Sequence, residues 1–503
     1  MSDAPAARWR ARAWMVLIAT SALYFLADNE ADNDLWVHLF TGRLILGSGA
    51  VPRVDDLSYT AAGLSWIDHE WLTEAAFAAA FDALGSTGLW LCKLALALLT
   101  AWLVWLPVAR RSRSPWVRGP VMLLVLATLA RGYAIRPQLI TYLGIAALLA
   151  WLDRLEEARR RPAAWALVAL SGAGFALWAN AHGGFIVGLG TLGLFSAAPR
   201  FTADAAAPSA PLRLAMLAAA SAAACLNPYG PALFAYLLAE MRAPHPLTEW
   251  QPVHPTDPAH APFLLMLAAL IATLPFARTL RRRPWWAALV AIVGAMAIRH
   301  QRHIPLFAVC AAAPLAEQVD AALGWLRART HLRLSATAHS AIAVALVALA
   351  LAQLGLLANR IRLTRGRIVY AAAEYPVGAL RFLRERDVHG HLAVPLDWGG
   401  YALWHGAPAV SVSLDGRFAT VYPPHVVEDN FAFFRGAAGS SGTRLLDAYD
   451  TTLVLVPQGV PTPLDGRPGW RLLYADSVAA LFAKGGAGGA AFGDAPRGWL
   501  AFP

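Results

Sequence analysis

The sequence predicts an α-helical polytopic membrane protein with an α/β domain at its C-terminal end. Of the 503 residues, 58% are hydrophobic and only 15% are charged, which is too apolar for a soluble protein of this length. The apolar residues form long runs, and the arginines gather in short clusters between them. Alternating runs typical of strands follow after residue 361. We therefore expect the apolar runs to lie in a bilayer and the segment after residue 361 to lie in water.

The apolar runs predict about eleven transmembrane helices. A span needs about 20 apolar residues, and several of these runs are shorter than that. In chain order they cover residues 13–27, 89–108, 121–130, 139–152, 164–179, 185–198, 214–226, 262–276, 285–298, 304–315 and 338–357.

The arginine clusters predict the orientation, because Lys and Arg accumulate in cytoplasmic loops. With the N-terminus inside, the following arginines fall on the cytoplasmic side: Arg110, Arg111, Arg113, Arg118, Arg154, Arg159 to Arg161, Arg200, Arg213, Arg278, Arg281 to Arg283, Arg327, Arg329 and Arg333. The net charge of +10 therefore reflects membrane topology and not a nucleic-acid partner. We expect a transmembrane domain over residues 1–358 and an extracytoplasmic α/β domain over residues 359–503.

The first outward loop, residues 28–86, is rich in groups that act as general bases or bind divalent cations. It has two segments with helical spacing, 35–46 and 71–84, which we expect to lie on the membrane surface. Its ionisable residues are Asp28, Glu30, Asp32, Asp34, His38, Asp55, Asp56, Asp68, His69, Glu70 and Glu74. The alternative is a solvated loop that is acidic by composition alone.

Several cations at predicted outward helix ends depart from the positive-inside trend. They are Arg131 and Arg136 in one loop, and Arg299, His300, Arg302 and His303 in another. A guanidinium binds phosphate in a bidentate manner, so these arginines favour an anionic lipid headgroup or a sugar phosphate. The alternative is that they form structural salt bridges with the loop carboxylates.

Two further outward segments carry polar residues. Asn180 and His182 end one predicted helix, and His182 is a candidate for lining a cavity, although a histidine there is more often a structural donor. Glu249, Trp250, His254 and Asp257 lie in a Pro-rich loop that we interpret as a cover for a site.

Several common catalytic motifs are missing. A zinc-protease helix needs His-Glu-x-x-His, and after His69-Glu70 the required position 73 is Thr. The chain has no P-loop lysine motif, no Gly-x-Ser-x-Gly elbow and no dinucleotide fingerprint. The sequence assigns no metal ligands and no cofactor, and leaves room for a divalent cation.

The tail reads as a small α/β domain. Short strands are expected at 391–396, 409–414 and 452–456, with a helix over 376–386 between predicted strand regions. Three tail motifs stand out: Glu374-Tyr375-Pro376, Asp397-Trp398-Gly399-Gly400-Tyr401 and Leu414-Asp415-Gly416-Arg417.

The layout resembles the GT-C superfamily of polyprenol-phosphate-dependent glycosyltransferases. The local match lies in the first loop, which contains Asp34-Leu-Trp-Val-His38, Gly42-Arg43, Asp55, His69-Glu70-Trp71-Leu72, Gly85 and Gly88. The tail motifs resemble unassigned bacterial membrane proteins that are grouped with these transferases.

The resemblance implies transfer of a sugar from a polyprenyl phosphate to an envelope glycan, lipid or protein on the outer face of a bacterial inner membrane. It implies that Asp34, or else Asp32, is the general base that deprotonates the acceptor. Arg136, Arg299 and Arg302 are candidates for the cation that stabilises the departing phosphate. Asp55 or His69 would position the acceptor, and His38, Glu70 and His182 complete the expected substrate-binding set.

Two other classes of function stay open on the sequence. A transporter or flippase would need intramembrane polar residues, but the charged residues concentrate at helix ends. A scaffold would use Trp398, Tyr401, Trp404 and Arg417 of the tail as a contact surface, although such aromatics more often form a domain core.

Overall fold

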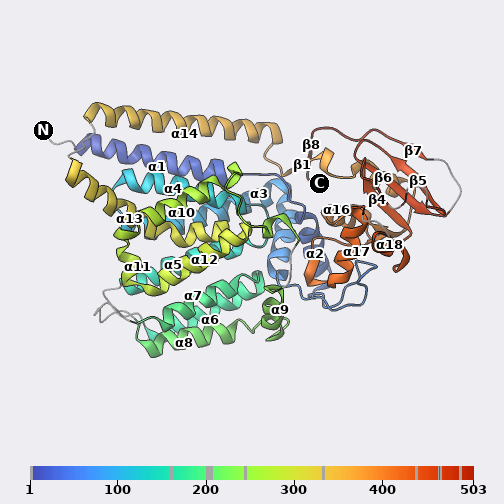
Figure 1. Cartoon of the computed structure of the whole chain (residues 1–503), viewed down its shortest axis with the longest axis horizontal. Coiled ribbons are helices and arrows are strands. Elements are labelled where there is room, and N and C mark those ends of the chain that lie inside the picture. Colours follow the sequence, from blue (N-terminus) through green and yellow to red (C-terminus); the bar gives the residue numbers. More distant parts are fainter. Residues whose placement is uncertain are drawn as a thin grey trace. The chain divides into compact units, whose positions relative to one another are not determined.

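The computed structural model divides into two compact units, each built from separated stretches of the chain (Figure 1). The first unit comprises Met1–Asp28, Trp90–Pro231 and Arg242–Gly366. The second comprises Asn29–Leu89, Ala232–Met241 and Arg367–Pro503, so that the first loop and the tail belong together. The structure describes residues 4–157, 163–199, 208–242, 246–330, 335–436, 440–462, 464, 467–485 and 490–503.

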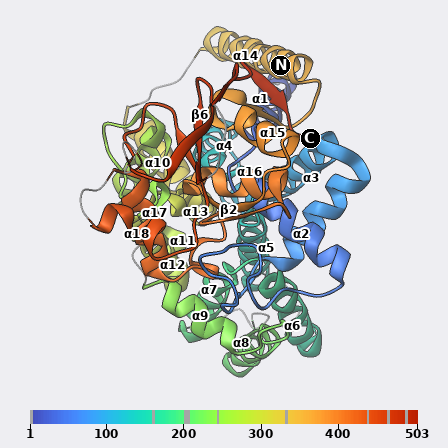
Figure 2. The ribbon, with the colours of Figure 1, turned by 90° about the vertical axis from the view of Figure 1, so that its right-hand side faces the viewer.

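The first unit is a bundle of helices. Helices α1 and α14 run side by side, as do α6 and α8 (Figures 1 and 2). Its helices are α1 (Ala4–Leu26), the later part of α3 (Trp71–Arg111), α4 (Pro115–Leu129), α5 (Leu139–Glu156), α6 (Ala164–Ala181), α7 (Phe185–Ala197), α8 (Ala210–Ala223), α10 (Ala261–Ala272), α11 (Arg278–Arg282), α12 (Pro284–Arg299), α13 (Ile304–Thr330) and α14 (Ala336–Thr364). Short 3-10 helices lie at Ala130–Gly132, Thr248–Trp250, Pro258–His260, Leu274–Phe276 and Gln301–His303.

Four helices of the described chain are long and apolar enough to cross a membrane by length and composition. They lie at Trp71–Arg111, Ala164–Ala181, Gln301–Thr330 and Thr337–Thr364. Four shorter apolar helices have 10–17 residues. At 1.5 Å per residue these shorter helices are no more than about 26 Å long, less than a hydrocarbon core of about 30 Å. The count of about eleven spans stays a prediction.

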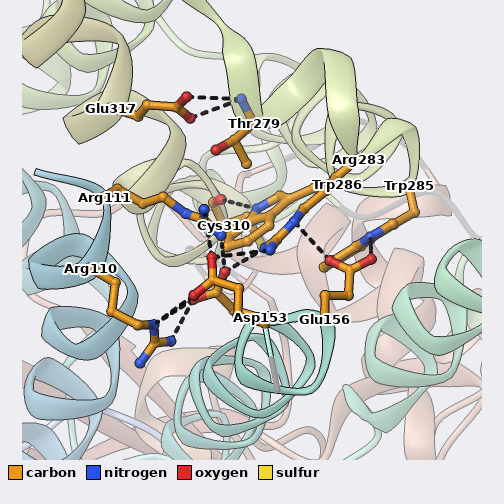
Figure 3. Close-up of polar contacts among 11 residues, drawn as sticks. Arg110, Arg111, Asp153, Glu156, Thr279, Arg283, Trp285, Trp286, Cys310 and Glu317 are labelled. Carbon is orange, nitrogen blue, oxygen red and sulfur yellow. Dashed lines mark hydrogen bonds and ion pairs between the residues drawn. The ribbon is translucent and has the colours of Figure 1, made fainter. Parts of the chain in front are cut away.

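Two of the arginine clusters predicted to be cytoplasmic meet around one carboxylate of the helical bundle (Figure 3). Asp153 of α5 is fully buried and accepts hydrogen bonds from Arg110 and Arg111 of α3 and from Arg283, the residue before α12. The predicted assignment of these helix ends to one side agrees with this contact. Arg159 to Arg161, Arg200 and Arg333 lie outside the described residues.

The second unit begins with the two helices that the sequence predicts in the first loop. They are α2 (Leu35–Ser48) and the first part of α3, which is interrupted at Gly85 where φ is +67°. The two helices cross closely at Gly42, because a Cβ there would lie 2.1 Å from the carbonyl oxygen of Glu74. Helix α9 (Ala232–Glu240) belongs to the same unit and was not among the expected elements.

The tail forms the α/β domain that the sequence predicts. Its six-stranded sheet has the order β3-β2-β4-β6-β5-β7, with β2 parallel to both β3 and β4 and with β4, β6 and β5 antiparallel. The strands are β2 (Gly390–Ala393), β3 (Val410–Val412), β4 (Leu453–Pro457), β5 (Trp470–Ala475), β6 (Ala479–Lys484) and β7 (Ala491–Phe492), and β1 (Val369–Ala371) pairs separately with β8 (Trp499–Ala501). The helices are α15 (Val377–Glu385), α16 (Leu396–Gly406), α17 (Pro424–Phe434) and α18 (Ser440–Asp447), with 3-10 turns at Ala372–Glu374 and Phe418–Thr420.

Three predicted strands and one predicted helix of the tail are therefore present as β2, β3, β4 and α15. The core between sheet and helices contains Ala393, Phe433, Leu445, Val454 and Val456, each at most 3% exposed. The predicted division at residue 358 falls inside α14, which continues to Thr364.

Candidate active site

A buried cluster of ionisable side chains forms where α2 meets the start of α3. His38 Nδ1 of α2 lies 2.7 Å from Glu74 Oε1 and 3.9 Å from Glu70 Oε2. The three side chains are 9%, 6% and 18% exposed, respectively. The sequence predicts His38 and Glu70 as substrate-binding residues, and the structure brings them together with Glu74.

The local sequence explains how these groups meet. The Asp68 carboxylate accepts a hydrogen bond from the Glu70 N–H, which turns the chain into α3. Glu70 and Glu74 are four residues apart at the start of α3 and so face the same side. On α2, His38 and Gly42 are also four apart, so the close crossing at Gly42 places His38 beside Glu74.

Two further groups border this cluster. Asp68 is 4% exposed, and its burial together with the neighbouring charge of Glu74 raises the pKa of its carboxyl well above the ordinary value. His69 Nε2 lies 3.5 Å from Glu70 Oε1, and its ring lies 5.7 Å from that of Tyr236 on α9. Acidic groups thus outnumber histidines in a space with little water.

Asp34 and Asp32, the predicted general bases, lie at the start of α2. The Asp32 carboxylate accepts a hydrogen bond from the Asp34 N–H at 3.0 Å. Asp34 precedes His38 by four residues, so the two share one face of the helix entrance. A Cβ on Gly416 would lie 2.5 Å from Asp34 Oδ1, which places the tail turn around Gly416 directly against this carboxylate.

The same tail turn holds the rest of the first loop through a buried ion network. Arg417 Nη1 lies 2.5 Å from Asp55 Oδ1, and Arg417 Nη2 lies 2.7 Å from Asp415 Oδ2. The Tyr422 hydroxyl donates to Asp415 Oδ2 at 2.7 Å. Asp55, which the sequence predicts as an acceptor-positioning residue, is therefore a structural partner of Arg417.

The other tail motifs surround Trp36 of α2. Its indole ring lies 5.7 Å from Tyr375, 4.9 Å from Tyr401 and 4.2 Å from Phe502, measured between ring centroids. A Cβ on Gly400 would lie 3.2 Å from the backbone nitrogen of Val37, so glycine lets α16 approach α2. The tail aromatics form a core around this helix.

Two of the predicted outward arginines share a different partner, in the first unit. Arg136 Nη1 lies 3.1 Å from Glu249 Oε2, and Arg302 Nη1 lies 3.2 Å from Glu249 Oε1. The guanidinium of Arg302 also lies 4.3 Å from the centre of the Trp250 ring. Glu249 and Trp250 belong to the Pro-rich loop that the sequence predicts as a cover. Arg299, at the end of α12, is exposed.

His182 occupies a structural position at the C-terminal end of α6. Its Nδ1 accepts a hydrogen bond from the Gly184 N–H at 2.8 Å and lies 2.8 Å from the Thr141 hydroxyl. A Cβ on Gly184 would lie 2.1 Å from Thr141 Oγ1, so the turn requires glycine. These contacts match the structural alternative for a histidine at a helix end.

The predicted site residues fall into two groups. The second unit holds Asp32, Asp34, His38, Asp55, His69 and Glu70, and the first unit holds Arg136, His182, Arg299 and Arg302. Sequence reasoning counted Glu74 among the ionisable groups of the first loop without giving it a role of its own, and it did not single out Tyr236. The four-residue spacing of Glu70 and Glu74 at a helix start is a signal for the former, whereas an apolar helix with one tyrosine gives none for the latter.

No family model and no curated protein sequence matches the chain. Solved structures of the archaeal oligosaccharyltransferase AglB from Archaeoglobus fulgidus do match it, with TM-scores of 0.56 and 0.57. The chain has an AglB-like GT-C fold. The first of these structures contains an inhibitory peptide and a dolichol-phosphate, and the second has a tethered acceptor peptide containing the NVT sequon.

The AglB likeness covers 89% of this chain and 69% of the AglB chain, at 13% and 12% sequence identity for the two structures. At such identity the likeness concerns the fold. It confirms the GT-C architecture that the first loop and the helical layout predict. It leaves the roles of individual residues to the geometry of this chain.

Proposed function

We propose that this protein transfers a sugar from a polyprenyl-phosphate donor to an envelope acceptor at the extracytoplasmic face of a bacterial plasma membrane. The observation that carries the proposal is the AglB-like fold, since AglB is an oligosaccharyltransferase solved with a dolichol-phosphate and with an acceptor peptide. In the proposed topology the N-terminus is cytoplasmic, and the first loop and the tail are outside. A glycan, a lipid or a protein would serve as the acceptor.

The proposed general base is Asp34, with Asp32 as the second choice. The base takes a proton from the acceptor as the acceptor attacks the anomeric carbon, and the bond from that carbon to the phosphate oxygen breaks. Support comes from the packing of the Gly416 turn against Asp34 and from the hydrogen bond between the Asp34 N–H and Asp32, which fix the start of α2. A fixed carboxylate loses little entropy when the acceptor arrives.

The departing phosphate needs a positive charge, and we assign this role to Arg136 and Arg302, with Arg299 as a further candidate. Glu249 contacts both Arg136 and Arg302, so one carboxylate holds the two guanidinium groups together. A phosphate of charge −1 or −2 binds guanidinium groups in the same way and can compete with Glu249 for them.

A transfer assay tests the proposal. Purified full-length protein is incubated with mass-tagged polyprenyl-phosphate sugars and an envelope extract, and tagged acceptors are followed by mass spectrometry. We expect Asp34→Asn to slow transfer by about 100-fold or more, as loss of a general base does. Asp56→Asn is the matched control, because Asp56 is an exposed carboxylate of the same loop.

Unchanged transfer by both Asp34→Asn and Asp32→Asn would overturn the assignment of the base. Movement of an unmodified lipid or solute across proteoliposomes, without sugar transfer and without dependence on Asp34, would favour a transporter.

A further inference from the structure

Lys93 places a buried ammonium group in a helix that is long and apolar enough to cross a membrane. It lies on α3, near the start of the apolar run 89–108, and is 1% exposed. A lysine near the end of a membrane helix usually extends its ammonium group to the water. The protein encloses Lys93 instead. A charged group held inside the apolar part of a membrane protein is costly and often marks a binding site.

The structural role of Lys93 explains its position but not its charge. Its Nζ donates to the carbonyl oxygen of Asp28 at 2.6 Å, two residues after the end of α1. Within the described part of the chain this is its one hydrogen bond, although an ammonium group has three N–H donors. Trp90 Nε1, one turn earlier on α3, donates to the neighbouring carbonyl of Ala27 at 3.1 Å. A neutral donor therefore suffices to fasten α3 to the end of α1.

A second cation lies at the same place. Arg360 Nη1 of α14 lies 3.5 Å from Asp28 Oδ1, and the two side chains are 38% and 53% exposed. Asp28 and Arg360 are also the charged groups that act on Lys93. One carboxylate thus faces two cations. An exposed ion pair with a single contact contributes little to stability, so another anion can replace Asp28 at the Arg360 guanidinium.

The end of α14 adds further positive charge. This helix runs beside α1 and ends at Thr364 (Figures 1 and 2). Arg362 and Arg365 are exposed there, and neither forms an ion pair with another described residue. In the proposed topology this end of α14 faces the outside, where arginines are uncommon beside a membrane helix. Their presence therefore indicates an anionic partner.

The surroundings favour a lipid over a free phosphate. Leu356 and Leu363 flank the arginines along α14 and are 57% and 70% exposed. Exposed leucines on a membrane helix offer apolar surface to acyl chains, while the arginines beside them meet the head group. A soluble anion would gain the charge interaction alone.

We propose that Arg360, Arg362 and Lys93 bind the phosphate head group of an anionic phospholipid of the surrounding bilayer. Basic groups at and between the ends of membrane helices bind such head groups. The Arg360 guanidinium binds phosphate oxygens directly, and Lys93 contributes its positive charge from inside the protein. The site uses other helix ends than Arg136 and Arg302, and it does not depend on sugar transfer.

Lipid binding to the purified protein tests the inference. Full-length protein in a nonionic detergent is titrated with a short-chain phosphatidylglycerol or with the matching phosphatidylcholine, and bound lipids are counted by native mass spectrometry. We expect the anionic lipid to bind the wild type about tenfold more tightly, and Arg360→Gln and Lys93→Met each to weaken it about fivefold. Arg154→Gln is the matched control, because Arg154 is an exposed arginine at the end of α5, and it should bind like the wild type.

Arg360 is partly exposed, so Arg360→Gln decides the question even if Lys93→Met does not fold. Equal binding of phosphatidylglycerol by Arg360→Gln and Arg154→Gln would overturn the site, and so would equal binding of the two lipids by the wild type. Displacement of the lipid by inorganic phosphate at the same concentration would contradict the assignment to a lipid. Because the readout is bound lipid, failure of the proposed transfer reaction would leave this result unaffected.

Discussion

Arg417 of the tail forms a buried ion pair with Asp55 of the first loop, 362 residues earlier in the chain, at 2.5 Å between Nη1 and Oδ1. The two side chains are 3% and 0% exposed. Arg417 also binds Asp415 and contacts the ring of Trp66 from the first loop, 4.7 Å from its centre. The tail therefore holds the segment that carries the proposed base, which gives the tail a structural role in the site.

Loss of this pairing should destabilise the second unit. Arg417→Ala leaves Asp55 and Asp415 buried without their cation, and such a loss costs about 3–5 kcal/mol. We expect a lower melting temperature and rapid proteolysis within the tail and the first loop. Arg381→Ala, an exposed arginine on α15, is the control and should melt like the wild type. Equal protease resistance of the two variants would show that the pairing contributes little.

Gly416 should control the proposed base without holding the fold. A Cβ at Gly416 would lie 2.5 Å from Asp34 Oδ1, so Gly416→Ala must push that carboxylate aside. We expect transfer to fall by about tenfold or more, since a small misplacement of a catalytic group is expensive. The melting temperature should change little. The measurement is the transfer assay beside a thermal melt.

Gly47→Ala is the matched control for this variant, because Gly47 lies in α2 with open space around its Cβ position. Alanine there should leave transfer unchanged and stabilise the helix slightly. A Gly416→Ala protein as active as Gly47→Ala would mean that Asp34 is not the base or that its position is not critical.

The helices and strands could be predicted from local patterns, and the tail packing could not. The apolar spacing over 35–46 and 71–84 predicts α2 and the start of α3, and the alternating runs predict β2, β3 and β4. The tail motifs stand out in the sequence because of their glycines and aromatics. Their role depends on contacts such as that from the Tyr375 hydroxyl to Asn33 Oδ1 at 2.6 Å, which no local pattern encodes.

The charged residues show the same limit. Arginine clusters predict which helix ends lie on one side, and the meeting of Arg110, Arg111 and Arg283 at Asp153 agrees with that prediction. The partner of Arg136 and Arg302 is harder to predict, because Glu249 lies more than 100 residues from Arg136. Arg136 and Arg302 pair with Glu249 of the Pro-rich loop and not with a carboxylate of the first loop, and this choice depends on where the helix ends lie in three dimensions.

His405 should make the stability of the second unit depend on pH. Burial, with a smaller contribution from Arg384, lowers the pKa of His405 to about 4, and its ring lies 4.3 Å from that of Tyr401. The unfolded chain takes up a proton near the ordinary pKa of 6.5 while the folded one does not. Stability is therefore full above about pH 6.5 and falls as the pH is lowered from 6.5 towards 4, by about 2 kcal/mol after allowance for the partly exposed ring.

The test is a series of thermal melts between about pH 4 and pH 7. His405→Phe keeps the ring packing and should lose this part of the pH dependence. His425→Phe removes an exposed histidine of α17 and should keep it. If the melting temperatures of the two variants depend on pH in the same way, His405 is not the source of the pH dependence.

Asp153 should be indispensable for the helical bundle. The carboxylate is fully buried and lies among Arg110, Arg111 and Arg283 at the ends of three helical segments (Figure 3). Glu156 and Glu157 add two carboxylates to the same cluster and compensate part of the positive charge. Asp153→Ala leaves the guanidinium groups facing one another across the space that the carboxylate filled, and we expect a loss of about 3–5 kcal/mol.

Glu157→Gln provides the comparison, because Glu157 contacts the same arginines but is 39% exposed. An exposed pair contributes about 0–1 kcal/mol, so this variant should unfold close to the wild type in detergent. The difference between the two variants separates a buried central charge from a peripheral one. Near-identical melting temperatures of Asp153→Ala and Glu157→Gln would mean that solvent stabilises the arginines once Asp153 is gone. Other contacts would then hold this end of the bundle, such as the hydrogen bond from Trp286 Nε1 to the carbonyl of Cys310 at 2.9 Å.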